Sequence, residues 1–393
     1  MDRRDQLSGA RRVVVKLGTN VITHADGEAR DGIALGRLNA LIEAVAREQR
    51  GGRQMLMVSS GAVGMGQRAL GRRERPRSLG LRQACAAVGQ GQLIALYSQA
   101  FNLLGVQVAQ VLLTQADLAD RDRLLCLRTT LTRLIELGVV PVLNENDSVS
   151  VRELIEHRAS TGGATDAVGF GDNDELSARV ALAVDADLLV LLTDVDGCYT
   201  ADPRHDSTAM RLGRLETIDD ALVTRAAGTT SAGGTGGMSS KLEAARAAAA
   251  GGTAVVITSG HNPDALRQAL AGEDVGTFIP AGGRRRAHRR AIAVAVSSAG
   301  ALVINDGALQ ALTRRKASLL PVGVLEVIGE FSPGDVVELR DASGRAHGRG
   351  LVNYASAACR ALLGRKSSEI ADVLGWQGYD TLISRENLVL TGV

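Results

Sequence analysis

A glycine-rich stretch that runs directly into a helix-forming sequence is the first candidate for chemistry in this chain. It reads GGTGGMSSKLEAARAAAA over residues 233–250. Backbone N–H groups at a helix N-terminus have no intrahelical partner and favour an anion, and Lys241 would add a mobile positive charge. The stretch does not match the G-x-x-x-x-G-K-[ST] phosphate loop, because its lysine follows two serines. We therefore interpret it either as a phosphate loop of another kind or as a flexible surface loop.

A second lysine interrupts an apolar run near the N-terminus. In VVVKLGTN (13–20), Lys16 stands at the end of a predicted buried strand, just before Gly18. A buried lysine needs a partner, which a ligand phosphate would supply; the alternative is a side chain that extends to the surface. Only four of the 45 Lys and Arg residues are lysines. Because an ammonium is compact and a guanidinium is a wide planar fork, these two lysines indicate roles that arginine cannot fill.

Polar motifs follow several other apolar runs: VSSGAVGMG (58–66), NENDS (144–148), GDNDELSA (171–178) and LLTDVDGCYTADPR (191–204). Their hydroxyl, amide and carboxylate groups suit an ammonium-bearing substrate or a metal-bound nucleotide, although helix caps and Asx turns would also explain them. Phosphoryl transfer depends on charge stabilisation and positioning more than on a nucleophile. Two lysines, glycine-rich loops and acid-amide motifs at one sheet edge would supply both.

The elements that must position these residues alternate along the chain. Apolar runs predict strands over 11–17, 54–59, 106–113, 139–143, 188–192 and 253–258, and helical spacing predicts helices over 31–50, 79–104, 121–137, 175–184 and 238–250. Strands of this apolar, non-alternating kind indicate a parallel sheet that is covered on both faces. Ligands of such sheets bind at the carboxyl ends of the strands, where all the candidate motifs fall.

The pattern changes near residue 280. Short strands with turn signals at 332–335 and 341–344 predict a small β domain, so we expect a catalytic domain over 1–285 and a second domain over 286–393. The arginine-rich stretch at 284–290 fits a solvated linker, with nucleic-acid binding as the alternative.

Bulk properties exclude several classes of protein. The chain has 393 residues and a net charge of +2, so its overall charge does not favour a polyanionic partner. We expect neither a signal peptide nor a membrane span, and therefore a cytoplasmic protein. Four scattered cysteines, Cys85, Cys126, Cys198 and Cys359, have no metal-like spacing and are predicted to be small buried hydrophobic residues.

Taken in order, the motifs VVKLGT, SSGA, NEND, GDND, LLTD, YTADPR and GTGGMSSK resemble the amino-acid kinase family. Within it, they are most similar to the kinases that phosphorylate the side-chain carboxylate of L-glutamate. The match covers residues 11–280, and SLLPVGV, FSPGDVVEL and GRGLVNY in the remainder resemble a PUA domain. The resemblance implies an α/β fold, a three-layer sandwich with a mostly parallel sheet, followed by a small β-barrel-like PUA domain.

The resemblance also implies the reaction and its residues. ATP would phosphorylate the γ-carboxylate of L-glutamate to give γ-glutamyl phosphate, the first step of proline biosynthesis. Lys16 and Lys241 would neutralise the transferring phosphoryl group, and Asp174 would hold both lysines. Glutamate would be bound by Ser60, Asn144, Asp147, Asp172 and Asn173. ATP, with Mg²⁺ bridging its phosphates and no metal ligand from the protein, would be bound by Lys16, Thr193, Asp194, Thr235, Gly236, Gly237, Met238, Ser239, Ser240 and Lys241.

The partners that the resemblance implies are L-glutamate, proline as feedback inhibitor, further copies of the chain in a homo-oligomer, and glutamyl phosphate reductase. One departure bears on proline: the segment 148–171 is longer than the family's usual stretch, which puts feedback sensitivity in doubt.

Two other functions stay open. An acetylglutamate or aspartate kinase would share the lysines but not the PUA-like tail. The other is an RNA-binding or RNA-modifying protein, in which the PUA-like domain would bind the RNA, although this domain has few aromatic residues to stack on bases. A Rossmann dehydrogenase is excluded, because no G-x-G-x-x-G follows the first strand.

Overall fold

The computed structural model describes residues 3–24, 32–72, 74, 76, 78–149, 173–203, 205–226, 237–282, 298–315, 317–376 and 378–390. The chain divides into two compact units, Met1–Gly282 and Gly283–Val393. Residues 283–297 lie outside the described part. The expected boundary after residue 285 and the role of the arginines at 284–290 therefore remain predictions.

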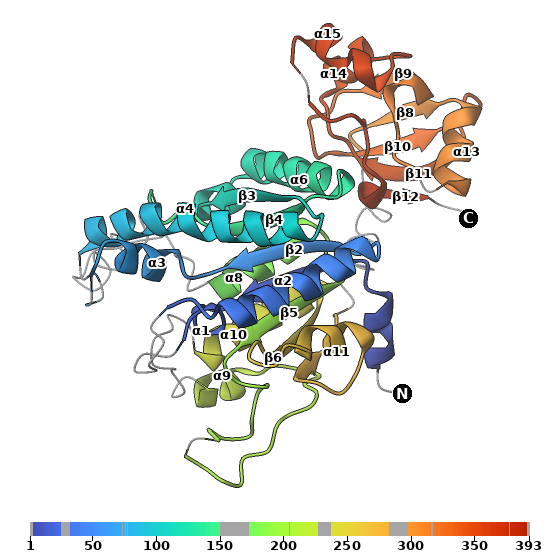
Figure 1. The fold of residues 1–393 in the computed structure, drawn as a ribbon. Coiled ribbons are helices and arrows are strands. Elements are labelled where there is room, and N and C mark those ends of the chain that lie inside the picture. Colours follow the sequence, from blue (N-terminus) through green and yellow to red (C-terminus); the bar gives the residue numbers. More distant parts are fainter. Residues whose placement is uncertain are drawn as a thin grey trace, which may run out of the picture. The chain divides into compact units, whose positions relative to one another are not determined.

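The N-terminal unit is built on one seven-stranded sheet with the order β3-β4-β2-β1-β5-β6-β7 (Figure 1). Its strands are β1 (Arg12–Leu17), β2 (Gln54–Ser59), β3 (Val108–Leu113), β4 (Val140–Glu145), β5 (Leu188–Thr193), β6 (Ala254–Ser259) and β7 (Thr277–Ile279). All neighbours pair in parallel except β6 and β7, which are antiparallel. The predicted strands thus form a mostly parallel sheet, with one antiparallel strand at its edge.

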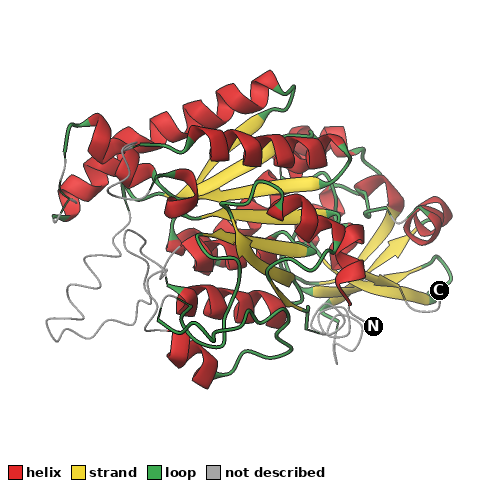
Figure 2. Ribbon diagram, turned by 60° about the horizontal axis from the view of Figure 1, so that its bottom comes forward, coloured by secondary structure: helices red, strands yellow, loops and turns green. Residues whose placement is uncertain are grey.

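Helices cover both faces of this sheet, as Figure 2 shows. One hydrophobic core contains residues of η1 (Arg3–Gly9), α1 (Thr19–Ile22), α2 (Leu35–Arg50), α3 (Ala62–Ala69), α4 (Leu79–Leu103) and α11 (Ala265–Ala271). The other contains residues of α5 (Gln115–Ala119), α6 (Arg121–Glu136), α8 (Asn173–Ala183), α9 (Asp220–Ala226) and α10 (Met238–Ala250). Side chains of β1 alternate between them, Val13 and Val15 in the first and Val14 in the second. This is the predicted three-layer sandwich.

Helices α3 and α4 cross with their backbones in contact. A Cβ atom on Gly89 would lie 1.8 Å from the Ala62 carbonyl oxygen, and one on Gly66 would lie 1.8 Å from the Cys85 carbonyl oxygen. Only glycine leaves room for such an approach. The crossing fixes the position of α4, which carries polar side chains to the carboxyl ends of β2 and β4.

The C-terminal unit has its own sheet and its own hydrophobic core. The sheet has the order β12-β11-β10-β8-β9, with strands β8 (Gly300–Ile304), β9 (Val324–Gly329), β10 (Val336–Arg340), β11 (Ala346–Leu351) and β12 (Leu388–Leu390). Helices α13 (Asp306–Arg314), α14 (Ser356–Ala361) and α15 (Ile370–Leu374) belong to the same unit. The predicted small β domain is confirmed.

The prediction that all four cysteines are buried is wrong for one of them. Cys126 on α6 is exposed, while the other three are buried. The buried residues of α6 are Leu127, Leu131 and Ile135, which recur every four residues, so Cys126 falls beside this apolar stripe. None of the helices in the described ranges has the length and apolarity needed to cross a membrane.

Candidate active site

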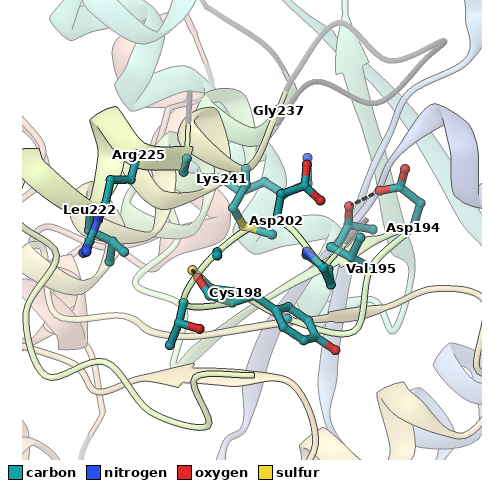
Figure 3. A pocket seen from close by; sticks show the side chains of 16 residues that line it. Asp194, Val195, Cys198, Asp202, Leu222, Arg225, Gly237 and Lys241 are labelled. Carbon is teal, nitrogen blue, oxygen red and sulfur yellow. Dashed lines mark hydrogen bonds between the residues drawn. The ribbon is translucent and has the colours of Figure 1, made fainter. Parts of the chain in front are cut away.

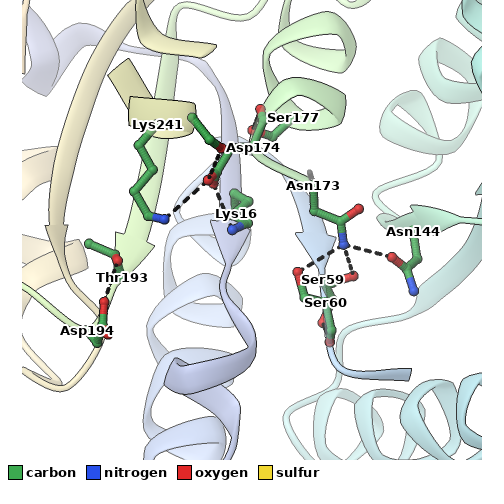
Figure 4. A network of polar contacts seen from close by, with 11 residues as sticks. Lys16, Ser59, Ser60, Asn144, Asn173, Asp174, Ser177, Thr193, Asp194 and Lys241 are labelled. Atoms are coloured by element: carbon green, nitrogen blue, oxygen red, sulfur yellow. Dashed lines mark hydrogen bonds and ion pairs between the residues drawn. The ribbon is translucent and has the colours of Figure 1, made fainter. Parts of the chain in front are cut away.

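Two buried lysines meet at one buried carboxylate (Figure 4). Lys16 of β1 places its Nζ 2.7 Å from Oδ1 of Asp174, at the start of α8, and Lys241 of α10 places its Nζ 3.2 Å from Oδ2. The exposed fraction is 2% for Lys16, 6% for Lys241 and 0% for Asp174. Lys16 is thus not a lysine that extends to the surface. The structure brings together the three residues expected to be catalytic.

The charges of this lysine–aspartate cluster (Lys16, Asp174 and Lys241) are strongly coupled. Burial alone would raise the pKa of Asp174, but the two neighbouring ammonium groups outweigh it and hold that pKa well below its usual range. The carboxylate is therefore ionised, and the three side chains together carry one positive charge. A net positive charge that is largely removed from water suits an anionic group such as a phosphoryl group.

A cavity of about 370 Å³ opens beside Lys241 (Figure 3). Its lining residues come from the end of β5, the loop that follows, helix α9 and the start of α10: Thr193, Asp194, Val195, Gly197, Cys198, Tyr199, Thr200, Ala201, Asp202, Pro203, Leu222, Arg225, Ala226, Gly237, Met238 and Lys241. A volume of this size is in the range of small-molecule sites, roughly 300–1,000 Å³. The segment 191–204, which we expected to face a nucleotide, supplies most of one wall.

Five of the residues expected to bind ATP line this cavity: Thr193, Asp194, Gly237, Met238 and Lys241. The others do not line it or cannot be placed. Ser240 instead donates a 3.1 Å hydrogen bond from Oγ to Oδ2 of Asp174. Ser239 lies in the first turn of α10 without lining the cavity. Lys16 does not line it either, but shares the Asp174 carboxylate with Lys241. Thr235 and Gly236 lie outside the described residues.

Asp194 is held at the edge of the cavity by two donors. Thr193 Oγ1 donates to Oδ1 at 2.9 Å, and Asn20 Nδ2 donates to Oδ2 at 3.2 Å. Burial raises the pKa of Asp194, but these hydrogen bonds, with a smaller contribution from the charge of Lys241, lower it overall. Asn20 was not predicted from the sequence, although it directly follows the Gly-Thr pair that ends the first motif.

The wall of the cavity is fastened to the edge strand β7. The Cys198 N–H donates a 2.8 Å hydrogen bond to Thr277 Oγ1, which in turn donates at 2.6 Å to the Leu212 carbonyl. One buried hydroxyl thus ties two parts of the segment after β5. Helix α9, which supplies Leu222 and Ala226 to the cavity, was also missed, although their four-residue spacing is a weak helical signal.

Amide and hydroxyl groups form a second cluster at the ends of β2 and β4. Nδ2 of Asn173 donates to the Ser59 carbonyl at 3.1 Å, to Ser60 Oγ at 2.9 Å and to Asn144 Oδ1 at 2.9 Å. The cluster joins three residues expected to bind the substrate, Ser60, Asn144 and Asn173. Helix capping does not explain Ser60, because α3 has no side-chain cap and its N-cap is Gly61, at a φ of 103°.

The other two residues expected to bind substrate are not placed in this amide cluster. Asp147 lies in the turn after β4 and is partly exposed. Asp172 lies outside the described residues.

Two residues of α4 support the amide cluster and were not singled out from the sequence. Asn144 Nδ2 donates to Gln90 Oε1 at 2.8 Å, and Tyr97 OH and Ser59 Oγ are 2.7 Å apart. Burial raises the pKa of Tyr97 to about 12, despite its hydrogen bond with Ser59. A signal was present in the sequence: Gln90 shares the helical spacing of the buried Leu93, Tyr97 and Phe101.

The first turn of α8 joins the two clusters. Asn173 turns to the amide cluster and its neighbour Asp174 to the lysines, as Figure 4 shows. Successive residues of a helix point in directions about 100° apart, so one turn can serve both sides. The arrangement can hold an acidic, ammonium-bearing molecule on one side and a phosphate-bearing molecule on the other, with two lysines between them.

Several known proteins are similar to this chain. Among solved structures, carbamate kinase from Giardia lamblia bound to AMP-PNP gives a TM-score of 0.46 at 18% identity, over 70% of this chain and 100% of that chain. The glutamate 5-kinase of Moorella thermoacetica is 43% identical over 387 residues, and that of Myxococcus xanthus is 45% identical over 390 residues; each match covers 98% of both chains. The sequence model of the amino acid kinase family matches residues 11–259, and that of the PUA domain matches residues 300–374. The chain belongs to the amino acid kinase family, in its glutamate 5-kinase branch, with a C-terminal PUA domain.

Proposed function

We propose that the protein acts as a glutamate 5-kinase. It transfers the γ-phosphoryl group of ATP to the γ-carboxylate of L-glutamate, giving γ-glutamyl phosphate and ADP, and so opens proline biosynthesis. The observation that carries the proposal is the lysine–aspartate cluster, which lies between the cavity beside Lys241 and the amide cluster at Asn173. The full-length similarity to curated glutamate 5-kinases specifies the substrate.

The two lysines supply the charge that phosphoryl transfer requires. The transition state spreads negative charge over the oxygens of the transferring group, and catalysis comes almost entirely from positioning and electrostatic stabilisation. ATP bound in the cavity would place its γ-phosphate near Lys241, which lines the cavity, and Lys16 would approach the same group from β1. Asp174 is 2.7 Å from Lys16 and 3.2 Å from Lys241, so it keeps both ammonium groups in place before the substrates arrive.

The amide cluster and the turn after β4 provide the glutamate side of the site. Ser60, Asn144 and Asn173 offer hydroxyl and amide groups to the substrate's carboxylate and ammonium. Asp147 adds a negative charge that suits the ammonium group, and Asp172, immediately before Asn173 in the chain, belongs to the same proposal. These roles extend the family pattern to the residues that match it here.

Mg²⁺ fits this site as an ion that arrives with the nucleotide. It usually keeps several waters and binds substrate phosphates together with few protein ligands. In the described ranges, no group of three or more His, Cys, Asp or Glu residues could hold a metal. When bound, the ion neutralises charge on the phosphates of ATP.

A hydroxylamine trap tests the proposed reaction, because hydroxylamine converts an acyl phosphate to a hydroxamate. We expect hydroxamate with Mg-ATP and L-glutamate, and little with aspartate or N-acetylglutamate. Equal turnover of N-acetylglutamate would move the assignment to the acetylglutamate kinases. No product with any acidic amino acid would reject carboxylate phosphorylation altogether.

The remaining expectations belong to the same proposal: a cytoplasmic homo-oligomer that is inhibited by proline and associates with glutamyl phosphate reductase. The family resemblance links proline sensitivity to the segment 148–171, which is described only to Val149. Proline titration of the hydroxamate assay tests inhibition, and the 260/280 absorbance ratio of the purified protein tests whether nucleic acid accompanies the PUA domain.

A further inference from the structure

We propose that Gln90 is a positioning residue for the amino-acid substrate: it fixes the orientation of the Asn144 amide and, through it, helps to hold Asn173 in place. The inference rests on the proposed function, because it concerns how glutamate is bound. Gln90 lies on α4, away from the motifs that carry the family resemblance. Hydrogen bonds connect Gln90 to Asn144, and Asn144 to Asn173 at the start of α8.

In both hydrogen bonds of this chain, the amide nearer to Asn173 is the donor. Asn173 Nδ2 donates to Asn144 Oδ1 at 2.9 Å, and Asn144 Nδ2 donates to Gln90 Oε1 at 2.8 Å. Both ends of the Asn144 amide are thus engaged, each by a different amide. Asn144 is 3% exposed and Gln90 is 8% exposed, so water cannot readily replace either contact.

The direction of the chain is set by the Ser59 backbone. A carbonyl can only accept a hydrogen bond, whereas a side-chain amide can donate or accept depending on how it is turned. The Ser59 carbonyl accepts from Asn173 at 3.1 Å, which fixes Nδ2 of Asn173 on this side. Asn144 must then present its oxygen to Asn173 and its NH₂ group elsewhere, and the acceptor that takes this NH₂ group is Gln90.

The packing of helix α4 holds the Gln90 side chain beside Asn144. Gly89, next to Gln90, allows α4 to contact the backbone of α3. Two turns further along α4, Tyr97 lies 2.7 Å from Ser59 Oγ. The same helix therefore supports β2 through Tyr97 and β4 through Gln90, on either side of Asn173.

The consequence for binding follows from Asn173. With its NH₂ group directed to the Ser59 carbonyl, Ser60 and Asn144, its Oδ1 is turned away from these acceptors, as Figure 4 shows. An acceptor oxygen in that position suits the ammonium group of an amino acid. Loss of the acceptor at position 90 leaves a buried NH₂ group of Asn144 unsatisfied, so the Asn144 amide can turn. Asn173 Nδ2 then loses one of its three acceptors and is held less firmly.

The test replaces Gln90 by methionine, which keeps the length of the side chain and removes the acceptor. Leaving one buried partner unsatisfied corresponds to a factor of about 5 to 150 in an equilibrium constant, so we expect Gln90→Met to raise KM for glutamate by a factor in that range. KM for ATP should change less than about twofold, because Gln90 contacts neither the cavity nor the lysines. Gln92→Met is the matched control, since Gln92 is an exposed residue of the same helix and should leave both constants unchanged.

A double-mutant cycle with Asn144→Ala separates positioning from general damage to the fold. If Gln90 acts through Asn144, adding Gln90→Met to Asn144→Ala should produce almost no further rise in KM for glutamate. Multiplying effects in the double variant would overturn the inference. A second readout is the rise in melting temperature that glutamate causes in the presence of a non-hydrolysable ATP analogue, which Gln90→Met should reduce.

The activity of the wild-type enzyme separates a failure of the proposed function from a failure of the proposed role of Gln90. Absence of hydroxamate formation with glutamate in the wild type would reject the proposed function. Normal wild-type activity together with an unchanged KM for glutamate in Gln90→Met would reject only the role of Gln90.

Discussion

Asp174 is the one carboxylate in this cluster and forms ion pairs with two ammonium groups, one at each of its oxygens. Asp174→Asn keeps the shape of the side chain but offers the lysines only a neutral group. Removing one partner of a buried ion pair destabilises a protein by about 3–5 kcal/mol. We expect the variant to lose about that much free energy of unfolding at pH 7, measured by urea denaturation, together with most of its kinase activity. Wild-type stability would show that Asp174 does not hold the lysines.

The same residue gives a pH dependence with a definite sign. Its pKa is lower in the folded protein than in the unfolded chain, where the ordinary value is about 3.9. Its contribution to stability is therefore complete above about pH 4 and is lost as the pH falls through the folded-state pKa. The gap in unfolding free energy between wild type and Asp174→Asn should be constant from about pH 7 to pH 5 and shrink in stronger acid. A gap that widens in acid would contradict this assignment.

The two lysines test whether shape matters as well as charge. Arginine supplies nearly all the positive charge of this chain, but its rigid planar fork cannot follow a phosphoryl group as a compact ammonium can. Loss of one preorganised contact to the transition state costs about 10²–10³ in kcat. We expect that loss in Lys16→Arg and in Lys241→Arg, measured by the hydroxamate assay, with melting temperatures close to that of the wild type.

Two lysines of the C-terminal unit serve as controls for these substitutions. Lys366→Arg should be nearly silent, because Lys366 is exposed and its backbone N–H makes the contact with Glu369. Lys316→Arg, at a position outside the described residues, should be silent as well. A Lys241→Arg variant with near-wild-type kcat would reduce Lys241 to a simple anchor for ATP.

Asp147 is predicted to act on the glutamate side alone. A carboxylate that accepts a hydrogen bond from an ammonium group contributes about 1.5–3 kcal/mol, so Asp147→Asn should raise KM for glutamate about tenfold or more. KM for ATP should stay nearly constant, because Asp147 does not line the cavity beside Lys241. A parallel rise in KM for ATP would place Asp147 on the nucleotide side.

At the scale of elements, the sequence was most informative where one physical pattern dominated. The central strands are continuous apolar runs, and β2 (Gln54–Ser59) and α10 (Met238–Ala250) have the bounds expected from the sequence. Residues at strand ends, such as Lys16 and Asn144, could be expected at one edge of the sheet, because ligands of parallel sheets bind at the carboxyl ends of the strands. The meeting of Lys16, Lys241 and Asp174 was expected from the family resemblance.

What sequence reasoning missed depends on contacts between distant elements. Gln90 reads as one polar residue in a long helix, and nothing local shows that its Oε1 accepts from Asn144. Asn20 likewise reaches Asp194, 174 residues further along the chain. The burial of Cys126 was predicted from residue type, but its position beside the apolar stripe of α6 decides its exposure.

The close crossing of α3 and α4 predicts that a side chain at position 89 destabilises the protein. A Cβ at position 89 would lie 1.8 Å from the Ala62 carbonyl oxygen and 2.5 Å from the Gly66 nitrogen, so Gly89→Ala must push α4 away from α3. Overpacking of this kind costs about 1–3 kcal/mol or more, and the shift also moves Gln90. We expect a lower melting temperature and a higher KM for glutamate.

A neighbouring glycine of α4 provides the control. Nothing lies within 4 Å of a Cβ at position 91, and replacing glycine by alanine in a helix stabilises by roughly 0.5–1 kcal/mol. Gly91→Ala should therefore be as stable as the wild type or slightly more so. If Gly89→Ala behaved like Gly91→Ala, the crossing would not fix the position of α4.

At the scale of the whole molecule, the two units have separate hydrophobic cores. The cores of the N-terminal unit draw on residues up to Ile279, and the core of the C-terminal unit begins at Leu302. Every residue proposed for catalysis or binding precedes residue 282. A catalytic unit with complete cores and a complete site should not need the PUA domain in order to fold or to transfer a phosphoryl group.

The 1–290 fragment tests this independence. We expect it to be soluble, to melt cooperatively, and to form hydroxamate from glutamate with kcat within a few-fold of the full chain, since neither its sheet nor its lysine–aspartate cluster uses a residue of the C-terminal unit. The full chain purified in parallel is the control. Differences confined to oligomeric state or to inhibition by proline would assign regulation or assembly to the PUA domain. An insoluble or inactive fragment, under conditions in which the full chain works, would show that the catalytic unit depends on the PUA domain.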